Sequence, residues 1–332
     1  MNHKNDENNI WLLLDDRPGN CSQVLGIGKA LELKHTLIKF NYNKLSKLPN
    51  LFLQKTIKHI NINDRKQFKP PWPKLIIGCG RKSAPIGRWI KKESHNYSKY
   101  IQIMWPAYPY KDLDLIFTPS HDNINKKQNV VNIQISPNVI DKKLLSESKV
   151  KWKTEFNQLN QPRVTLVIGG DTKLHKLNAN HIKELFKQIK EIMNDKGSLL
   201  VTSSRRTSIE AYEAIKNEIK KLKIQSVFWD PKYKNPNPYY GYLSYADIVV
   251  VTGDSVSICS EVCATGKPLL IYAPNAITIK KHKLFHTLLI KKRIAQYLNK
   301  SNLKNIKQLK YKAINESKNI ANIIKKTYLK NQ

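Results

Sequence analysis

The 332-residue chain is poor in arginine, cysteine and glycine, and it has no long hydrophobic run. It contains 8 arginines beside 50 lysines, and only 12 glycines and 4 cysteines. This composition excludes collagen-like, coiled-coil and disulfide-scaffold proteins. Apolar residues still make up 40% of the chain, enough to bury hydrophobic cores, and the length favours two domains.

The cysteines form no C-x2-C pair and have no histidine cluster near them, so we expect reduced, packed thiols rather than a zinc site. The longest apolar stretch near the start, Ile10–Leu14, is too short for a signal sequence. No run approaches the roughly 18 apolar residues of a membrane span. These features predict a soluble, cytoplasmic protein. The four cysteines are Cys21, Cys79, Cys259 and Cys263.

Basic residues dominate the charge, because 58 Lys and Arg against 25 Asp and Glu give a formal net charge of +33. A/T-rich codons favour Lys, Asn and Ile together, so a solvated lysine surface without a partner is one interpretation. Scarce arginine, with no zinc-finger, RNP-like or homeodomain motif, predicts no nucleic-acid partner. Residues 278–332 carry 15 Lys and Arg and one acid, Glu316. Such a basic amphipathic end favours an anionic membrane surface, and hence a peripheral position on the inner face of the cytoplasmic membrane.

Short apolar runs recur along the chain, each followed by a small or polar loop and then by a helix-like stretch. Near-continuous apolar runs predict strands buried on both faces, and the alternation with helices predicts a doubly wound α/β architecture. The expected strands are Ile10–Leu14, Leu75–Ile77, Leu115–Phe117, Val164–Ile168, Leu199–Val201 and Ile248–Val251. The expected helices include Ala84–Glu93, Ile182–Asn194 and Ile209–Lys221.

A polar, helix-like stretch from Val150 to Pro162 marks the expected domain boundary. We therefore expect one Rossmann-like domain over residues 1–158 and another over residues 159–300. The tail, residues 301–332, is rich in Lys and Ile and is predicted to form a basic helix.

Arginine is informative here, since the chain uses lysine wherever either cation would do. The rigid, forked guanidinium group suits phosphate, and structural ion pairs are the alternative. Five of the eight arginines lie in or near strand-end loops: Arg17, Arg81, Arg88, Arg205 and Arg206.

The loop Gly78–Ser83 leads into the helix expected from Ala84, with Ser83 suited to the N-cap. Backbone N–H groups around Gly80, together with Arg81, would form an anion site at the helix N-terminus. The loop has neither Walker A spacing nor the third glycine of a Rossmann fingerprint. A tight turn without a ligand is the alternative.

Two loops in the second half offer further anion donors. Gly169 and Gly170 follow the first strand of this half and let a ligand approach the backbone closely. A later strand is followed by hydroxyl and guanidinium donors, namely Ser203, Ser204, Arg205 and Arg206.

The stretch 252–268 is typical of a strand end, a small polar loop with Asp254, and a helix. The hydroxyls of Ser255 and Ser257, with the helix N–H groups, could hold a diphosphate. Glu261 lies one turn further along and could accept hydrogen bonds from ribose hydroxyls. An ordinary first-turn acid is the alternative for Glu261.

Five short stretches, in both halves of the chain, carry a resemblance to a known family. Through them the chain resembles the bacterial and plant family named after the elongated-mitochondria fission factor. One branch of that family is regarded as outer-core lipooligosaccharide glycosyltransferases. The last stretch is also similar, more distantly, to the donor site of glycosyltransferases with two facing Rossmann-like domains. The matching stretches are W-L-L-L-D-D-R-P-G-N-C-S-Q (11–23), G-C-G-R-K-S-A-P (78–85), T-S-S-R-R-T (202–207), N-P-Y (237–239) and T-G-D-S-V-S-I-C-S-E-V-C-A-T-G-K-P (252–268).

The resemblance implies a nucleotide-sugar donor in the second half, an acceptor on the first, and a C-terminal helix that crosses back to the first domain. It brings Arg17, Gly19 and Asn20 into the expected substrate site. Asn237 and Tyr239, in the N-P-Y stretch, are expected to close over the nucleotide base, with a rigid loop without ligand as the alternative.

Sugar transfer leaves negative charge on the departing nucleotide, which a metal or fixed donors must stabilise. Asp112-Leu113-Asp114 has the D-x-D pattern of metal-dependent transferases, but it directly abuts an expected strand, so we expect no metal and no cofactor. The general base is expected from the first half: Asp16, or His121 with Asp122 as its orienting partner. Alternatively, Asp16 caps a helix and His121 is a surface loop residue.

The sequence thus predicts a metal-independent glycosyltransferase that uses a nucleotide-diphosphate sugar. Its acceptor would be an envelope glycan or a lipid-linked saccharide. A nucleotide-sugar 2-epimerase, which has the same two-domain plan, is the second hypothesis. A non-enzymatic adaptor at a membrane surface or in the division machinery is the third.

Overall fold

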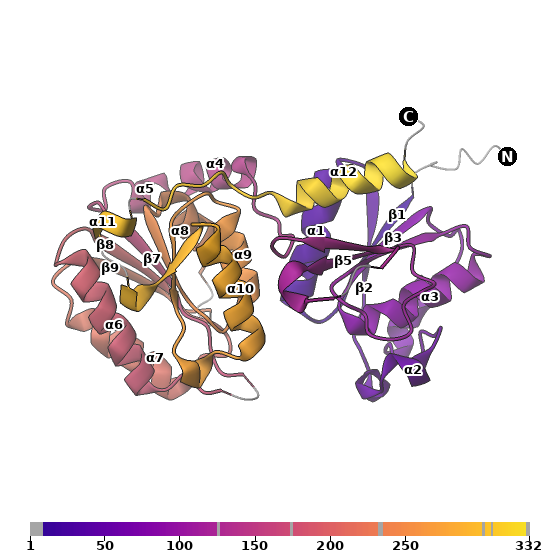
Figure 1. Ribbon diagram of the computed structural model, residues 1–332, viewed down its shortest axis with the longest axis horizontal. Coiled ribbons are helices and arrows are strands. Elements are labelled where there is room, and N and C mark those ends of the chain that lie inside the picture. The colour runs from indigo at the N-terminus through magenta and orange to yellow at the C-terminus, as the bar shows by residue number, and fades with distance from the viewer. Residues whose placement is uncertain are drawn as a thin grey trace. The chain divides into compact units, whose positions relative to one another are not determined.

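The computed structural model describes residues 9–124, 127–172, 175–231, 235–300, 303–306 and 308–329. The chain divides into an N-terminal unit, residues 1–139 with 315–332, and a C-terminal unit, residues 140–314. Each unit has one six-stranded sheet whose neighbouring strands are parallel, covered by helices (Figure 1). This confirms the predicted fold class of two Rossmann-like domains with a C-terminal helix that returns to the first.

The sheet of the N-terminal unit has the order β2-β1-β3-β4-β5-β6. Its strands are β1 (Ile10–Leu14), β2 (His35–Lys39), β3 (Leu75–Cys79), β4 (Lys99–Ile103), β5 (Leu115–Pro119) and β6 (Val130–Ile133). Its helices are α1 (Pro18–Leu31), α2 (Asn50–Leu53), α3 (Ala84–Glu93) and α12 (Glu316–Tyr328). Short 3₁₀ helices are η1 (Lys44–Lys47), η2 (Ile62–Gln67), η3 (Arg81–Ser83) and η4 (Ser120–Asp122).

The sheet of the C-terminal unit has the order β12-β11-β10-β7-β8-β9. Its strands are β7 (Arg163–Val167), β8 (Ser198–Thr202), β9 (Gln225–Trp229), β10 (Ile248–Thr252), β11 (Leu269–Tyr272) and β12 (Ala295–Tyr297). Its helices are α4 (Lys142–Lys151), α5 (Lys153–Phe156), α6 (Ala179–Met193), α7 (Ile209–Lys220), α8 (Tyr239–Tyr245), α9 (Val256–Cys263), α10 (Lys280–Lys291) and α11 (Leu303–Ile306), with η5 (Asn275–Ile277) and η6 (Leu298–Lys300).

Alternating side chains of β1 show why each sheet is buried on both faces. Leu12 packs in one core with residues of α1 and α12, whereas Trp11 and Leu13 pack in the other with residues of α3. All five side chains of β1 are buried. A strand between two helix layers needs apolar residues at every position, which is the pattern that predicted it.

The units divide at residue 139 rather than at the expected 158, because α4 and α5 pack on the C-terminal unit. α4 contacts α8, and Phe156 of α5 contacts the rings of Tyr242 and Tyr245. Phe156 is buried in the cluster that these tyrosines form. Two aromatic side chains in this polar stretch, Trp152 and Phe156, therefore decide where it belongs.

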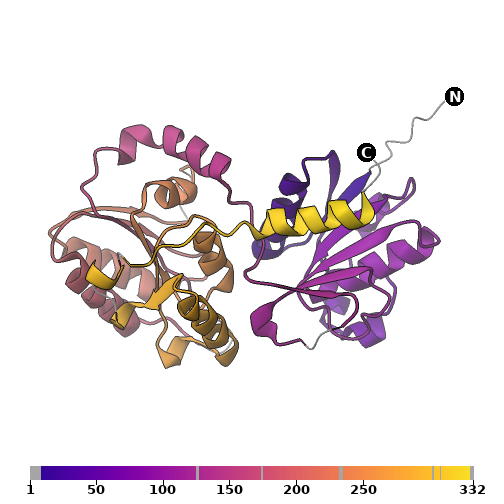
Figure 2. The same cartoon turned by 45° about the horizontal axis from the view of Figure 1, so that its top comes forward.

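The returning helix is shorter than the predicted 301–332, since α12 begins at Glu316 and residues up to 314 belong to the C-terminal unit. α12 packs along α1 and lies over the sheet of the N-terminal unit (Figure 2). Ile320, Ala321 and Ile324 are fully buried there. The Ser317 hydroxyl donates to the carbonyl oxygen of Asn138 over 2.7 Å and accepts from its N–H over 3.0 Å.

We expect Ile320→Ala to lower the free energy of unfolding by about 2–5 kcal/mol, because it leaves a cavity in the core beneath α12. Urea unfolding followed by tryptophan fluorescence measures this change. Leu284→Ala, at an exposed position of α10, is the matched control and should change stability by no more than about 0.5 kcal/mol. Equal stability of the two variants would contradict the docking of α12.

Candidate functional site

The strand order of the C-terminal sheet reverses between β7 and β10. In open α/β sheets the ligand crevice lies at the carboxyl ends of the strands at this switch point. The loops that follow β7, β8 and β10 meet there, bringing together Gly169-Gly170, residues 203–207 and residues 253–255. They are the loops predicted from the sequence to bind an anion.

Side chains from two of these loops hold the glycine pair in place. The N–H of Gly169 donates to Thr252 Oγ1 over 2.7 Å, and that hydroxyl donates to Asp254 Oδ1 over 2.7 Å. The N–H of Gly170 donates to Asp254 Oδ2 over 3.3 Å. Thr207 Oγ1 donates to the carbonyl oxygen of Gly169 over 2.7 Å. We call Gly169, Gly170, Thr207, Thr252 and Asp254 the glycine network.

The half-exposed Arg206 links the glycine network to the backbone of Asp171. Its Nη2 donates to Asp254 Oδ2 over 3.3 Å and its Nη1 donates to the carbonyl oxygen of Asp171 over 3.1 Å. Asp254 is only 8% exposed and accepts from three donors. Arg206 and Asp254 were both expected to bind substrate. Their contacts show instead that they stabilise the conformation of the loops.

The donors that remain for a ligand lie next to this network. Arg205 is exposed and makes no hydrogen bond or ion pair within the part of the chain that the structure describes. Ser203 Oγ is buried and has no hydrogen-bond partner among the described residues. Ser204 Oγ, in contrast, accepts from the N–H of Arg206 over 3.0 Å and so supports the loop.

Helix α9 starts beside the glycine network, as the sequence predicted. Ser255 is its N-cap, and Ser255 Oγ accepts from the N–H of Ile258 over 3.4 Å. The first-turn N–H groups around Ser257 point out of the helix end, where they attract an anion. The Ser255 hydroxyl therefore fixes the helix end rather than reaching a ligand by itself.

Glu261, one turn into α9, lies beside the N-P-Y stretch, whose Tyr239 is the first residue of α8. Tyr239 donates from its hydroxyl to Glu261 Oε2 over 2.6 Å. Burial, and then the negative charge of Glu261, raises the pKa of Tyr239 well above its ordinary value, so the phenol remains a donor. Asn237 Oδ1 accepts from the N–H of Tyr239 over 2.9 Å, which makes Asn237 a local turn former.

Two groups at this site had no role assigned to them from the sequence. Thr252 begins the stretch 252–268, and the structure shows that it ends β10 and links Gly169 to Asp254. His282 of α10 lies beside the backbone of Gly253, and burial lowers its pKa although the Asp254 carboxylate opposes the shift. Nothing in the local sequence connects α10 with β10, because 28 residues separate Asp254 from His282.

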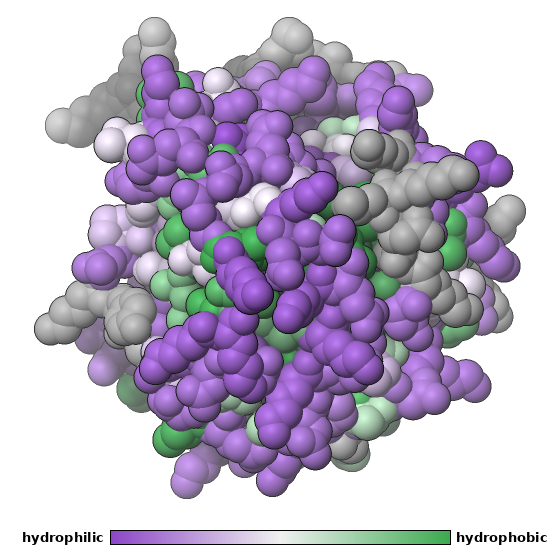
Figure 3. Space-filling model, turned by 90° about the vertical axis from the view of Figure 1, so that its left-hand side faces the viewer, coloured by the Kyte–Doolittle hydropathy of each residue, from purple (hydrophilic) through white to green (hydrophobic). Residues whose placement is uncertain are grey.

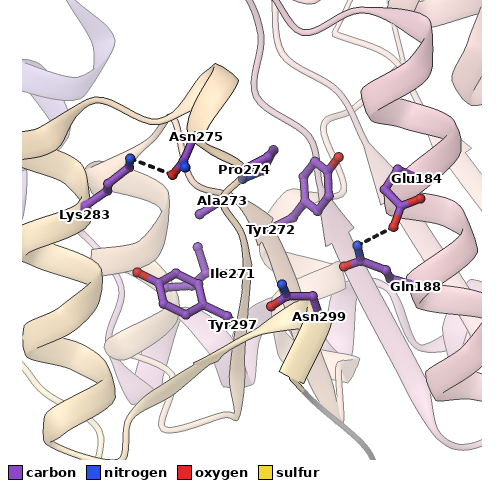
Figure 4. Close-up of a pocket in the computed structure, with 10 residues that line it drawn as sticks. All are labelled: Glu184, Gln188, Ile271, Tyr272, Ala273, Pro274, Asn275, Lys283, Tyr297 and Asn299. Carbon is purple, nitrogen blue, oxygen red and sulfur yellow. Dashed lines mark hydrogen bonds between the residues drawn. The ribbon is translucent and has the colours of Figure 1, made fainter.

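A cavity of about 340 Å³ opens at the ends of β11 and β12 (Figure 4). Its polar side chains are partly paired, since Lys283 donates to Asn275 over 2.7 Å and Gln188 donates to Glu184 over 2.8 Å. Ala273, which lines the cavity, backs onto Gly253 of the switch-point loop. Arg205, Ser255 and Glu261 do not line this cavity.

The N-terminal sheet has its own switch point, between β1 and β3. Asp15, which the sequence did not single out, accepts from the N–H of Arg17 over 3.0 Å and from Asn20 Nδ2 over 2.8 Å. Burial raises its pKa, although these two hydrogen bonds lower it. Asp16 is exposed next to it and does not cap α1, whose N-cap residue is Arg17. Gly19 is exposed in the first turn of α1.

The Gly80–Ser83 loop does not present the open anion site that the sequence predicted. Arg81 donates from Nη1 to the carbonyl oxygen of Leu48 over 2.7 Å and from Nη2 to that of Ser46 over 3.1 Å. Ser83 is fully buried, and its hydroxyl donates to the carbonyl oxygen of Gly80 over 2.8 Å. Gly80 itself has a φ of +82°, which glycine adopts readily. The loop is therefore a structural turn that also fastens the segment 44–50.

His121 and Asp122 come together as expected, with His121 Nε2 lying 3.5 Å from Asp122 Oδ1. Their side chains are only 2% and 6% exposed, so His121 is neither the surface loop residue nor the open base that the sequence suggested. Asp16 is thus the expected base that is exposed to solvent.

The D-x-D pair serves the fold of the N-terminal unit. Arg88 Nε donates to both oxygens of Asp112, over 2.9 and 2.8 Å, and Lys91 Nζ lies 2.6 Å from Asp114 Oδ2. Burial raises the pKa of Asp112, but the opposing effects of Arg88 and Lys55 are larger together, so the pKa lies below its ordinary value. Across the described residues no cluster of three or more His, Cys, Asp or Glu side chains could hold a metal ion.

The helices and the surface agree with the basic, polar composition. Within the described ranges no helix combines the length and the hydropathy that a bilayer crossing requires. Figure 3 shows one side of the C-terminal unit, which hydrophilic residues cover for the most part, with small hydrophobic patches between them. All four cysteines are free thiols, and three of them are buried.

Comparison with known proteins finds a matching family model and relatives in bacteria and plants. The model of the family described as mitochondrial fission ELM1 matches residues 18–328. The uncharacterized protein RP120 of Rickettsia prowazekii is 31% identical over 354 aligned positions, covering 96% of this chain and 98% of that protein. The mitochondrial fission protein ELM1 of Arabidopsis thaliana is 27% identical over 241 positions, covering 66% of this chain and 56% of that protein.

Solved structures with the same fold include a MurG and a sugar-nucleotide epimerase. MurG of Acinetobacter baumannii matches with a TM-score of 0.57 and 12% identity, covering 96% of this chain and 100% of MurG. UDP-GlcNAc 2-epimerase from Neisseria meningitidis, solved with UDP-GlcNAc, matches with a TM-score of 0.55 and 15% identity, covering 97% and 100%. At such low identity these similarities establish the fold alone.

We expect Gly170→Ala to destabilise the C-terminal unit by roughly 1–3 kcal/mol, because its Cβ would lie 2.3 Å from the backbone carbonyl carbon of Arg206. Gly19→Ala is the matched control, because Gly19 is exposed in the first turn of α1, where an added methyl group meets solvent. Thermal unfolding should therefore show the larger loss for Gly170→Ala; the reverse order would refute the tight packing of these loops.

Proposed function

The chain belongs to the mitochondrial fission ELM1 family, and from this membership and the switch-point site we propose that it is a metal-independent glycosyltransferase. Its donor is a nucleotide-diphosphate sugar, bound by the C-terminal unit. Its acceptor is an envelope glycan or a lipid-linked saccharide, bound by the N-terminal unit. The observation that supports this proposal most strongly is the glycine network together with the neighbouring hydrogen-bond donors, Arg205 and Ser203, that have no partner among the described residues.

The diphosphate would lie over the N-terminus of α9. The first-turn N–H groups near Ser257, the guanidinium of Arg205 and the hydroxyl of Ser203 are the donors on hand. When the sugar leaves, charge grows on the diphosphate, and donors fixed in advance stabilise it without reorganisation. The Arg206 guanidinium, 3.3 Å from Asp254 Oδ2, reduces the repulsion between Asp254 and this charge, and hydrogen bonds from Thr252 and Gly170 stabilise the carboxylate.

Glu261 supports the nucleotide end of the same site. A carboxylate in this position accepts hydrogen bonds from ribose hydroxyls, and the Tyr239 phenol holds it in one orientation. The exposed carboxylate of Asp16, at the end of β1, is the proposed base that takes the proton of the acceptor hydroxyl.

A nucleotide-sugar 2-epimerase is the second candidate. The similarity to a UDP-GlcNAc 2-epimerase is nearly equal to the similarity to MurG, with TM-scores of 0.55 and 0.57. Both reactions need the same diphosphate cradle. They differ in whether an acceptor is required, so product analysis separates them.

We expect Arg205→Ala and Glu261→Ala each to abolish the thermal stabilisation that UDP or UDP-GlcNAc gives the protein, without unfolding it. Both side chains lie away from the hydrophobic cores, and a ligand of the native state raises the melting temperature by mass action. A panel of UDP, GDP, ADP and CMP identifies the base.

The matched control for Arg205→Ala is Arg293→Ala. Arg293 is also exposed, but it lies two residues before β12 and so at the amino edge of the same sheet. UDP and UDP-GlcNAc should raise the melting temperature of Arg293→Ala as much as that of the wild type. Wild-type binding by Arg205→Ala and Glu261→Ala would refute the proposed donor site.

With UDP-GlcNAc and no acceptor, we expect no 2-epimer product, and with an acceptor extract we expect sugar transfer that persists in EDTA. The reason for the second expectation is that Asp112 and Asp114 are held in ion pairs. Mass spectrometry of the sugar nucleotides and of the acceptor fraction measures both outcomes. Epimer formed without acceptor, or transfer lost in EDTA, would contradict a metal-independent transferase.

A further inference from the structure

Exposed large hydrophobic side chains gather in one short segment of the N-terminal unit. Four of the eleven found among the described residues fall within residues 45–52: Leu45, Leu48, Leu51 and Phe52. Phe52 is 72% exposed, and the three leucines are 43–48% exposed. We call residues 44–58, which contain η1 and α2, the apolar ledge. Figure 1 shows α2 at the end of the N-terminal unit away from α12.

Polar side chains fasten the apolar ledge from beneath. Ser46 and Asn50 are buried, and Asn50 Nδ2 donates to the carbonyl oxygens of Arg81 and Pro106, each over 2.8 Å. Arg81 in turn donates to the carbonyl oxygens of Ser46 and Leu48. Leu53 of the ledge is buried as usual, but the buried Ser46 and Asn50 anchor the segment through polar groups while Leu45, Leu48, Leu51 and Phe52 are exposed. This fixed, outward apolar surface has no role in the proposed transfer.

The charged residues that the ledge segment itself contributes are all basic. Between Glu32 and Asp64 the chain carries six lysines and no acidic residue. Lys44, Lys47 and Lys58 are exposed and form no ion pair with any described residue, whereas Lys55 lies 3.4 Å from Asp112. Apolar side chains ringed by lysine fit a surface that is hydrophobic beneath and anionic on top.

The basic C-terminal residues do not offer a comparable apolar face. On α12, Ile320, Ala321 and Ile324 are buried within the N-terminal unit. On α10, Phe285 and Leu289 are buried in the C-terminal unit, which leaves Leu284 as the exposed large hydrophobic side chain among its described residues. Among the described residues, the ledge therefore has the densest run of exposed large hydrophobic side chains, four within eight residues, and exposed lysines lie beside them.

We propose that the apolar ledge docks the protein on an anionic lipid surface, with Leu51 and Phe52 entering the boundary between headgroups and acyl chains. The surrounding lysines contact the lipid phosphates. In a full Rossmann unit a helix and a third strand would follow β2, and here the ledge takes their place in the chain. Docking through the ledge would hold the N-terminal unit, which is proposed to bind the acceptor, at the lipid surface. The inference goes beyond sugar transfer and does not depend on it.

The test measures binding of the full chain, without nucleotide, to vesicles of equal parts phosphatidylglycerol and phosphatidylcholine. We expect salt-sensitive binding to these vesicles and much weaker binding to pure phosphatidylcholine. Leu51→Ser/Phe52→Ser should weaken binding at least about tenfold, since two large apolar side chains no longer leave water. Lys44→Gln/Lys47→Gln should weaken it and flatten the salt dependence.

The matched control is Val150→Ser/Ile209→Ser, which removes two exposed apolar side chains of the C-terminal unit. It should bind like the wild type, and all variants should melt alike because the changed residues are exposed. Unchanged binding by Leu51→Ser/Phe52→Ser, or equal binding to neutral vesicles, would overturn the proposal. So would a wild-type dimer that this variant converts to a monomer in light scattering, since the ledge would then join two copies. Nucleotide binding is measured separately, so its loss or retention leaves this result intact.

Discussion

The hydrogen bonds that tie the Gly169-Gly170 loop to Thr252 and Asp254 are the constraint on which the candidate site depends. They join the carboxyl ends of β7 and β10, the two strands between which the sheet order reverses. Because both glycine N–H groups have internal acceptors, the loops hold their shape before a ligand arrives. The donors that would meet a diphosphate, Arg205 and Ser203, lie beside this frame rather than inside it.

Sequence reasoning predicted the strands that are continuous apolar runs, but it missed the edge strands and also the buried central strand β4, whose sequence K-Y-I-Q-I mixes polar and apolar residues. β1 and β10 were predicted within one residue of their observed ends, because a short continuous apolar run followed by a polar loop is typical of a buried parallel strand. β2, at the edge of its sheet, has three exposed residues among five, so its sequence carries no buried-strand pattern. The domain boundary depended on Trp152 and Phe156, whose partners 80 to 90 residues away cannot be inferred from local polarity.

At the level of single residues, the structure brings the three predicted loops of the C-terminal unit together at one edge of the sheet, whereas several predicted ligand-binding side chains are engaged within the protein. The scarcity of arginine favoured phosphate over structural ion pairs for Arg81 and Arg88, yet Arg81 binds carbonyl groups and Arg88 forms the alternative, an ion pair with Asp112. The same planar guanidinium that suits phosphate also suits these internal acceptors, so the residue type alone does not decide between them. Thr252 and His282 reach the site through tertiary contacts that no spacing in the sequence reveals.

Amide chemical shifts during a titration with UDP test the central claim most directly. If the C-terminal switch point binds the diphosphate, the signals of Gly169, Gly170 and the first turn of α9 move first and furthest, and they saturate together. Shifts confined to the cavity lined by Tyr272 and Tyr297, or to the N-terminal unit, would show that the glycine network supports the fold and binds no nucleotide.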